Sequence, residues 1–180
     1  MPLRFACPAP LLARGITLHE ERVADLPALR ALFRHQRWAE FAMLPWDDAA
    51  KAALLDQQFD AQRRHYASAH PQVLFLVLMH QEQTAGRLYL GRSEAGDLGL
   101  LDILLSPQYR GQGLGTALIG ALQDQAAMDG RRVLLEVGKG NPAAGLYRRL
   151  GFCPLADTGI GWHMAWAAAS TLLSGVHAAP

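Results

Sequence analysis

The chain has 180 residues, with 17 Lys plus Arg, 16 Asp plus Glu, a formal charge of +1 and 51% hydrophobic residues. This length and apolar content predict a single globular domain and exclude disorder throughout. The balanced charge lacks the basic excess that drives binding to phosphate backbones, so no nucleic-acid partner is expected. Cys7 and Cys153 form no C-x-x-C pattern. We therefore expect neither a disulfide framework nor a zinc knuckle, and a cytoplasmic location fits best.

The two ends of the chain are expected to lie outside the domain. Residues 1–14 are interrupted by prolines and lack the continuous apolar region of a signal peptide, so they predict a flexible leader. The domain is expected over 15–167, and 168–180 form a tail of uncertain order. The longest strongly apolar run, Val73 to Met79, is far shorter than the roughly 20 residues that span a bilayer. No membrane partner is therefore expected.

The first elements are a short strand and two helices. A strand is expected over 16–19, and apolar residues from Leu26 onward then recur at helical spacing. Either Asp47 or Asp48 could cap a long second helix, which runs to about Ala69 before a proline ends it.

The middle of the chain is rich in strands. Val73 to Met79 is apolar without interruption, and a turn over 80–86 leads into a second run over 87–91. These two runs predict a hairpin. Residues 98–105 form another mostly apolar strand.

The clearest helix signal follows these strands. Apolar residues from Gly113 to Met128 follow i, i+3, i+4 spacing, and Gly130 lies where a helix C-cap is expected. Beyond it we expect a strand over 133–137, a short helix over 142–150 and closing strands over 152–155 and 162–166. This order predicts an α/β sandwich around a mixed sheet.

A glycine-rich loop joins the strand over 98–105 to this helix. Gly111, Gly113 and Gly115 alternate within the loop. Glycines allow tight turns and close approach of a ligand to the amides, and a helix start adds unpaired N–H groups and a positive dipole end. The pattern predicts an anion site. A plain turn or a buried cap is the alternative.

Two standard phosphate loops can be compared with this segment. The chain has no Gly-Lys-Ser or Gly-Lys-Thr, which excludes a P-loop. The dinucleotide pattern G-x-G-x-x-G is nearly present, but Thr116 replaces its third glycine. Glu136 lies about 20 residues further on, as a ribose-binding acid would. A dinucleotide-binding protein therefore stays as an alternative.

Two motifs carry a resemblance to a known family. Arg110-Gly111-Gln112-Gly113-Leu114-Gly115 matches the R/Q-x-x-G-x-G/A signature of the GNAT superfamily of N-acetyltransferases. The run from Asn141 to Phe152 resembles the N-x-x-A-x-x-L-Y-x-x-x-G-F block of the same superfamily, with Asn141 and Tyr147 one residue closer than in its common form. The resemblance implies an α+β sandwich whose central sheet is mixed and mostly antiparallel, with helices on both faces.

The resemblance also implies the activity and the cofactor site. Acetyl-CoA would be the co-substrate, and its acetyl group would pass by direct attack to a primary amine of a small molecule or protein. The residues expected to bind the coenzyme are Leu104, Leu105, Arg110, Gly111, Gln112, Gly113, Leu114, Gly115, Thr116, Asn141 and Tyr147. The pantetheine arm would lie between Leu104 and Leu105 on one strand and Val137 and Gly138 on another. A non-catalytic acyl-CoA-binding module is the alternative from another functional class.

Three residues are candidates for the chemistry. In the family, a tyrosine at the position of Tyr147 lies near the coenzyme sulfur as general acid; packing of its ring beside Phe152 is the alternative. Glu136 resembles the glutamate of ribosomal-protein acetyltransferases, which works through water. Asp102 is the rival base, because a carboxylate in an apolar run is costly to bury without a partner or a task. A solvent-facing Glu136 and an Asp102 paired to Arg87 are the alternatives.

The acceptor side is expected from the first two helices and their connection. Candidate residues there are Trp38, Phe41, Trp46, Gln58, Gln62, His65 and Tyr66. Aromatic rings near a carboxylate suit a cationic amine, although core packing is the alternative. No H-x-x-x-H or H-E-x-x-H pair occurs, so no metal is expected. The apolar residues Trp162, Trp166, Leu172 and Leu173 make a homodimer plausible.

Overall fold

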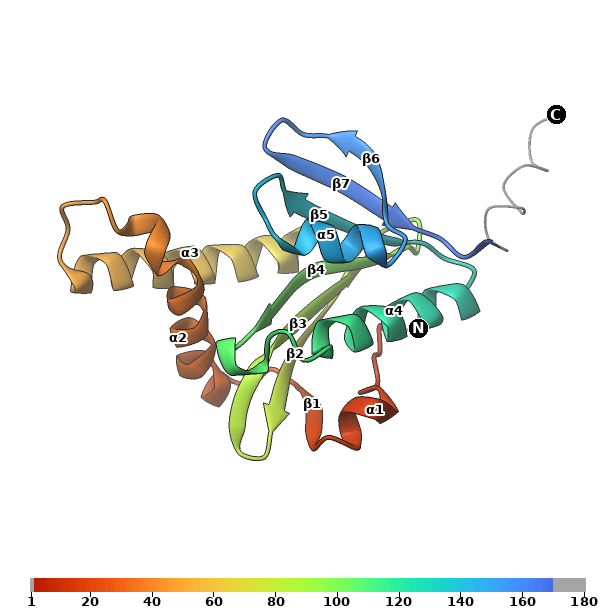
Figure 1. Cartoon of the computed structure of the whole chain (residues 1–180), viewed down its shortest axis with the longest axis horizontal. Helices are drawn as coiled ribbons and strands as arrows, with labels where there is room; N and C mark the ends of the chain where they lie inside the picture. The colour runs from red at the N-terminus through yellow and green to blue at the C-terminus, as the bar shows by residue number, and fades with distance from the viewer. Residues whose placement is uncertain (1, 170–180) are drawn as a thin grey trace.

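The computed structural model describes residues 2–169 and places seven strands in one sheet, in the order β1-β2-β3-β4-β5-β7-β6 (Figure 1). The strands are β1 (Ile16–Glu20), β2 (Gln72–His80), β3 (Gln83–Arg92), β4 (Leu98–Leu105), β5 (Val133–Gly138), β6 (Cys153–Asp157) and β7 (Gly161–Trp166). The β4–β5 pair is parallel, and every other neighbouring pair is antiparallel. The predicted mixed, mostly antiparallel sheet is confirmed.

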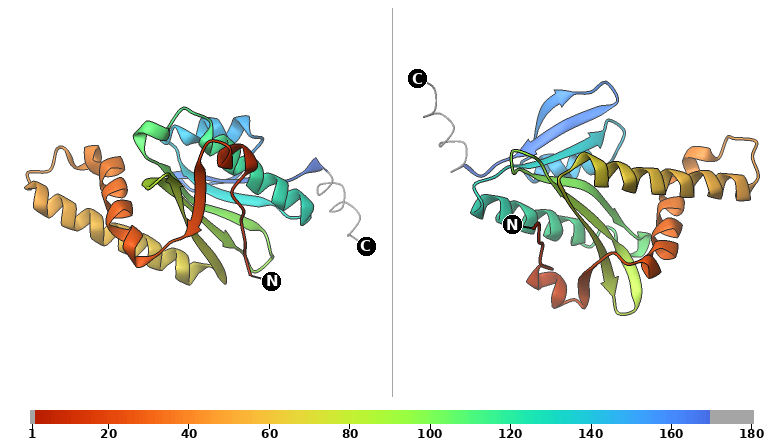
Figure 2. Two further views of the ribbon diagram at one scale, coloured as in Figure 1. Left: turned by 90° about the horizontal axis from the view of Figure 1, so that it is seen from below. Right: turned by 180° about the vertical axis from the view of Figure 1, so that it is seen from behind.

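Helices cover both faces of this sheet, as predicted. They are α1 (Ala9–Leu12), α2 (Leu26–Arg37), α3 (Asp48–Ala69), α4 (Leu114–Met128) and α5 (Ala143–Arg149). Apolar side chains of α2 and α3 form one core cluster against β2, and those of α1, α4 and α5 contribute to a larger cluster with the strands. The rear view shows α3 crossing its face of the sheet (Figure 2).

The helix boundaries follow the expected capping residues. Asp47 is the N-cap of α3, and its carboxylate accepts a hydrogen bond from the Ala50 N–H at 2.7 Å. Gly130 follows α4 with a φ of 62°, which a glycine adopts without a Cβ penalty. Both predicted helix ends are therefore confirmed.

The β2–β3 hairpin is tighter than the sequence predicted. The two strands stay paired as far as His80 and Gln83, so the expected turn over 80–86 was too long. Gly86 suggested a turn but lies within β3, where an added Cβ would come within 2.4 Å of the Leu104 carbonyl oxygen. The glycine is needed for close approach of β4 rather than for a turn.

The N-terminal segment is packed, and the prediction of a flexible leader over 1–14 was wrong for the residues described. Leu3 and Leu11 are buried in the main core, with exposures of 7% and 1%. Pro10 lies in the first turn of α1, where proline is tolerated, so the prolines shape this segment instead of breaking it. The segment lacks helical or strand periodicity, which is why its burial was missed.

Some expectations concern the C-terminal end or the surface. Leu172 and Leu173 lie outside the described residues, as does most of the predicted tail. Trp162 and Trp166 are partly buried against the main core. Within residues 2–169, no helix combines the length and apolarity needed to cross a bilayer.

The buried N-terminal segment gives a prediction for stability. Leu11→Ala should lower the free energy of unfolding by about 2–5 kcal/mol, because it removes a fully buried side chain and leaves a cavity. Leu12 is 50% exposed, so Leu12→Ala should change the same quantity by less than about 0.5 kcal/mol. Urea unfolding of both variants measures the difference. Equal effects would mean that α1 does not contribute to the core.

Candidate active site

The site begins where β4 and β5 separate. Their pairing is confined to Leu98–Leu100 against Val133–Leu135, and beyond it the two strands diverge (Figure 1). A cleft of about 340 Å³ opens between them. Because parallel strands lose their hydrogen bonds where they diverge, backbone groups of both strands face this cleft.

A β-bulge lies at the start of the separation. Tyr89 of β3 pairs with Asp102 and Leu90 pairs with Leu100, so Leu101 is an extra residue on β4. The Tyr66 hydroxyl of α3 donates a hydrogen bond to the Leu101 carbonyl at 3.0 Å. Bulges often redirect side chains next to active sites, and here the tyrosine satisfies a carbonyl that the ladder leaves unpaired.

Most of the side chains predicted for the site line this cleft. Those that do are Asp102, Leu104, Leu105, Arg110, Gly115, Glu136, Asn141 and Tyr147. They come from β4, the glycine loop, α4, β5 and α5, so the fold brings together residues that are distant in sequence. Five of the residues expected to bind the coenzyme do not line this cleft: Gly111, Gln112, Gly113, Leu114 and Thr116. The side chain of Leu114 is buried in the core, and only its backbone belongs to the loop.

The glycine loop presents open backbone donors. Gly111 and Gly113 have φ values of 71° and 80°, and an added Cβ at either would meet no atom within 4 Å. Gly113 is the N-cap residue of α4, and because it has no side chain, it offers no capping acceptor to the first N–H groups of the helix. The first N–H groups of α4, at Leu114, Gly115 and Thr116, therefore have no intrahelical acceptor and lie at the positive end of the helix dipole.

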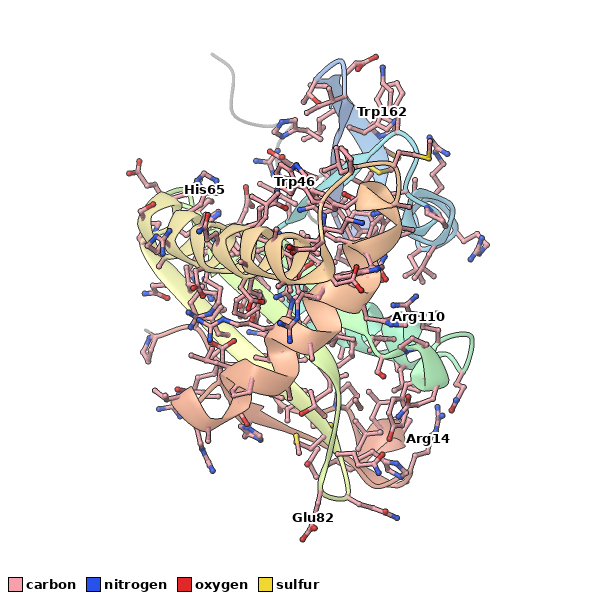
Figure 3. The ribbon with its side chains drawn as sticks, turned by 90° about the vertical axis from the view of Figure 1, so that its left-hand side faces the viewer. Arg14, Trp46, His65, Glu82, Arg110 and Trp162 are labelled. Carbon is pink, nitrogen blue, oxygen red and sulfur yellow. The ribbon has the colours of Figure 1, made fainter. Side chains whose placement is uncertain are left out.

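Two arginines flank this loop. Arg110 donates from Nε to the Leu105 carbonyl at 2.8 Å and from Nη2 to Gln36 Oε1 at 2.5 Å. Arg14 donates from Nη1 to the Gln112 carbonyl at 2.9 Å and from Nη2 to Gln112 Oε1 at 3.1 Å. Arg14 reaches the glycine loop from the N-terminal segment, whereas Arg110 lies at the start of the loop with its guanidinium bonded to Leu105 and Gln36 (Figure 3). Together with the open amides, they make the loop electropositive.

Tyr147 lies on α5 with its ring packed against Phe152. The two ring centroids are 5.8 Å apart in an edge-to-face arrangement, and Tyr147 is 6% exposed. Burial, with a smaller contribution from the negative charge of Asp102, raises the pKa of Tyr147 to about 12. Its hydroxyl therefore keeps its proton at neutral pH. The Tyr147 ring therefore packs against the core, and the same residue also lines the cleft.

Asn141 has a defined structural task. Its Oδ1 accepts a hydrogen bond from the Ala143 N–H at 2.9 Å, which satisfies a donor at the start of α5. The side-chain oxygen is thus used by the protein, although the residue still lines the cleft.

Asp102 is paired to Arg87, the alternative that the sequence left open. Arg87 Nε lies 2.5 Å from Asp102 Oδ2, and Arg87 is only 1% exposed. Arg87 Nη2 also donates to Gln62 Oε1 at 2.9 Å, and its guanidinium lies 4.8 Å from the centroid of the Tyr89 ring. Burial raises the pKa of Asp102, and the Arg87 charge opposes that shift. The carboxylate therefore compensates a buried cation.

Glu136 is the more available carboxylate. Its side chain is 75% exposed, and its Oε1 lies 3.2 Å from His163 Nε2. No local motif points to His163, which lies opposite Glu136 in the β5–β7 register. His163 could have been found by pairing the expected strands over 133–137 and 162–166 in this antiparallel register. Glu136 faces both the cleft and a second depression on the α3 side of the sheet.

Several residues expected on the acceptor side have other roles. Trp38 and Phe41 pack against the core cluster of α2 and α3. Gln58 accepts a hydrogen bond from Arg37, and Gln62 accepts one from the buried Arg87. Trp38 and Phe41 thus pack in the core, which was the alternative to a place in the acceptor site.

The remaining acceptor candidates lie outside the core cluster of α2 and α3. Trp46 is 47% exposed on the connection between α2 and α3 (Figure 3). His65 and Tyr66, near the C-terminal end of α3, line the depression that also contains Glu136. Among residues 2–169, no group of three or more His, Cys, Asp or Glu side chains is arranged to hold a metal ion.

Comparison with known protein families agrees with this geometry. Residues 71–154, which include the glycine loop and α5, match the family model of an acetyltransferase (GNAT) domain. Over these residues, which are a little under half of the chain, the sequence is similar to acetyltransferases of the GNAT superfamily. No curated protein matches the sequence.

Solved structures share the fold over most of the chain. The PaiA N-acetyltransferase from Thermoplasma acidophilum, solved with coenzyme A, is 18% identical with a TM-score of 0.62, covering 85% of this chain and 99% of that protein. An acetyltransferase from Thermus thermophilus is 19% identical with a TM-score of 0.62, covering 86% and 97% respectively. The ribosomal-protein-S18-alanine N-acetyltransferase from Escherichia coli is 24% identical with a TM-score of 0.56, covering 84% and 93%. These likenesses show the GNAT fold.

The Arg87–Asp102 pair gives a prediction that separates structure from chemistry. Asp102→Asn should lower the free energy of unfolding by about 3–5 kcal/mol, because it leaves the Arg87 charge buried without a partner. The control is Asp157→Asn, which weakens an exposed pair with Lys139 and should leave the free energy of unfolding nearly unchanged, because solvent screens that pair. Chemical denaturation gives both values. A variant as stable as the wild type but inactive would instead place Asp102 in the reaction.

Proposed function

We propose that the chain transfers an acetyl group from acetyl-CoA to a primary amine of a small molecule or protein by direct attack. The observation that carries this proposal is the convergence of Tyr147 and Glu136 on one cleft whose lining includes Arg110 and Gly115 of the glycine loop. A buried hydroxyl donor, an accessible carboxylate and an anion-binding loop are the groups that this reaction needs.

The cleft fits the coenzyme. The open space above Gly111 and Gly113 leaves the loop amides accessible to a pyrophosphate, which Arg14 and Arg110 would attract. The exposed Thr116 adds a hydroxyl nearby. The apolar Leu104 and Leu105 line the cleft and suit the pantetheine arm, whereas Val137, expected on the other side of that arm, is buried in the core. The coenzyme A complex of the T. acidophilum protein supports this assignment.

The residues then divide the chemistry between them. Acetyl-CoA supplies the acetyl group as a thioester. Glu136, the exposed carboxylate, receives a proton from the acceptor ammonium so that the nitrogen attacks as a neutral amine. Tyr147 keeps its proton at neutral pH until the reaction, and as general acid it gives that proton to the leaving sulfur, so coenzyme A departs as the thiol. The remaining extra proton of the attacking nitrogen returns to the tyrosine oxygen, directly or through water, as the amide forms. The carbon–nitrogen bond forms, the carbon–sulfur bond breaks, and no covalent intermediate with the protein is needed.

The other readings have less support. A non-catalytic acyl-CoA-binding module would need neither Tyr147 nor Glu136 at the cleft. A dinucleotide-binding protein would need a tight strand-to-helix turn, whereas Pro107–Tyr109 form a 3₁₀ turn that lengthens the loop. A cytoplasmic location remains part of the proposal, as does a possible homodimer.

The coenzyme site is tested by blocking the loop. Gly113→Trp should weaken acetyl-CoA binding from a micromolar dissociation constant by at least about 100-fold, because an indole would fill the space over the amides. Gly130→Trp is the matched control, since Gly130 also has a positive φ and open space but lies beyond the far end of α4. Calorimetry with acetyl-CoA and NAD measures both. Binding of NAD but not acetyl-CoA would overturn the proposal.

The donor role is tested by removing one oxygen. Tyr147→Phe keeps the ring against Phe152 but removes the hydroxyl, so kcat should fall by about 100-fold while the dissociation constant of acetyl-CoA changes less than about twofold. Because the pKa of Tyr147 is about 12, wild-type activity should show no loss from its ionisation between pH 6 and 10, a range about two or more units below that pKa. Unchanged turnover in Tyr147→Phe would remove Tyr147 from the chemistry.

A further inference from the structure

The depression on the α3 side of the sheet has its own chemistry. It holds about 370 Å³ and runs beside β4, β5 and β7; we call it the acceptor groove, defined by Tyr66, His70, Asp97, Leu134, Glu136 and His163. The groove shares Glu136, Leu100 and Leu101 with the coenzyme cleft. A ligand in the groove with its amine at Glu136 would therefore face the cleft through the opening between β4 and β5.

The carboxylates of the acceptor groove can balance the charge of one bound cation. Its two carboxylates are Asp97 and Glu136. Asp97 is neutralised by Arg132, whose Nη2 lies 2.7 Å from Oδ2 and whose backbone N–H donates to Oδ1 at 3.1 Å. Glu136 has only His163 as an ionic contact within the described part of the chain. One carboxylate is thus left to receive an ammonium group.

The histidines of the groove do not add a second anionic site. Burial and the nearby His65 lower the pKa of His70, which keeps its imidazole neutral at pH 7. The neutral ring can donate or accept a hydrogen bond, and because a histidine carries no negative charge in either protonation state, none of the groove's histidines is a counter-ion for a second ammonium.

Part of the groove wall between these groups is apolar. Leu101, Leu134 and Leu155 lie there, whereas Leu100, Leu135 and Met164 border the groove but are buried in the main core, and His65 and Ser93 add polar groups. A volume of 370 Å³ equals the share of about 12 water molecules at about 30 Å³ each, which suits a molecule of about ten heavy atoms. Leucine walls disfavour a ligand covered with hydroxyl groups, because buried hydroxyls need partners.

We propose that the acceptor is a small primary amine with one ammonium group and a compact apolar body about the size of a phenyl ring. This inference rests on the proposed acetyltransferase function and narrows its substrate class. A polyamine would place its second cation where the described residues offer no second unpaired carboxylate, and an amino sugar would place some of its hydroxyls against leucine side chains. A peptide would extend beyond the volume of the groove.

A panel of four amines tests this class. The wild-type chain is assayed with acetyl-CoA by release of the coenzyme thiol, using 2-phenylethylamine, spermidine, glucosamine and an alanine-initiated tripeptide. The kcat/KM for 2-phenylethylamine should exceed each of the others by at least about tenfold, a difference of about 1.4 kcal/mol in transition-state binding. A higher value for any of the other three would overturn the inference.

Two substitutions at Leu134 make the test specific to the groove. Leu134 lines the groove but not the coenzyme cleft, so Leu134→Trp should raise KM for 2-phenylethylamine at least about tenfold and leave acetyl-CoA affinity within about twofold. Leu134→Glu adds a second carboxylate and should shift the ratio of kcat/KM values toward spermidine. Thr17→Trp, on an exposed position of β1, is the control and should change neither quantity.

The failure of this inference can be told apart from failure of the proposed function. Calorimetry with acetyl-CoA is done first, and absence of binding would overturn the acetyltransferase proposal itself. If acetyl-CoA binds but no amine is turned over, binding of the four amines to the coenzyme A-saturated protein gives the ranking. Absence of 2-phenylethylamine binding in that titration would overturn the substrate class alone.

Discussion

The separation of β4 from β5 after Leu100 is the constraint on which the site depends. A continuous sheet would satisfy its backbone groups and leave no space between these strands. Here the bulge at Leu101 starts the divergence, and Tyr66 satisfies the carbonyl that the bulge releases. The glycine loop, α5 and Glu136 then contribute to the same opening. Each of them would lie against a closed sheet if the pairing continued.

A buried cation stabilises the side of the sheet that carries α2 and α3. Arg87 is almost fully buried beneath aromatic rings of both helices and pairs with Asp102, next to the cleft. Burial of an arginine is costly unless a counter-charge and hydrogen bonds surround it. Asp102 and Gln62 meet that need, which links the packing of α3 to the strand that lines the coenzyme cleft. The two carboxylates of the site thus have different surroundings, one paired inside and one open to the acceptor groove.

Local patterns predicted the parts of the site that are close in sequence. The glycine loop before α4 and the position of Tyr147 before Phe152 follow from short motifs, and the structure places both as expected beside one cleft. Residues missed by the analysis depend on long-range pairing. Arg14 reaches a loop 98 positions away, and His163 meets Glu136 only through the β5–β7 register. Gly86 was misread because a glycine needed for close strand packing has the same local signal as a turn.

The contact between Arg14 and Gln112 has a consequence for the order in which the protein assembles. The segment that contains Arg14 is synthesised before its partner in the glycine loop, which follows 98 residues later. Leu11 likewise becomes fully buried only after α4 and the central strands, which form the same core cluster, have been synthesised. Contacts of such large sequence separation form slowly because a long loop must close. During synthesis the first residues therefore stay available to chaperones and proteases until the loop and α4 have emerged.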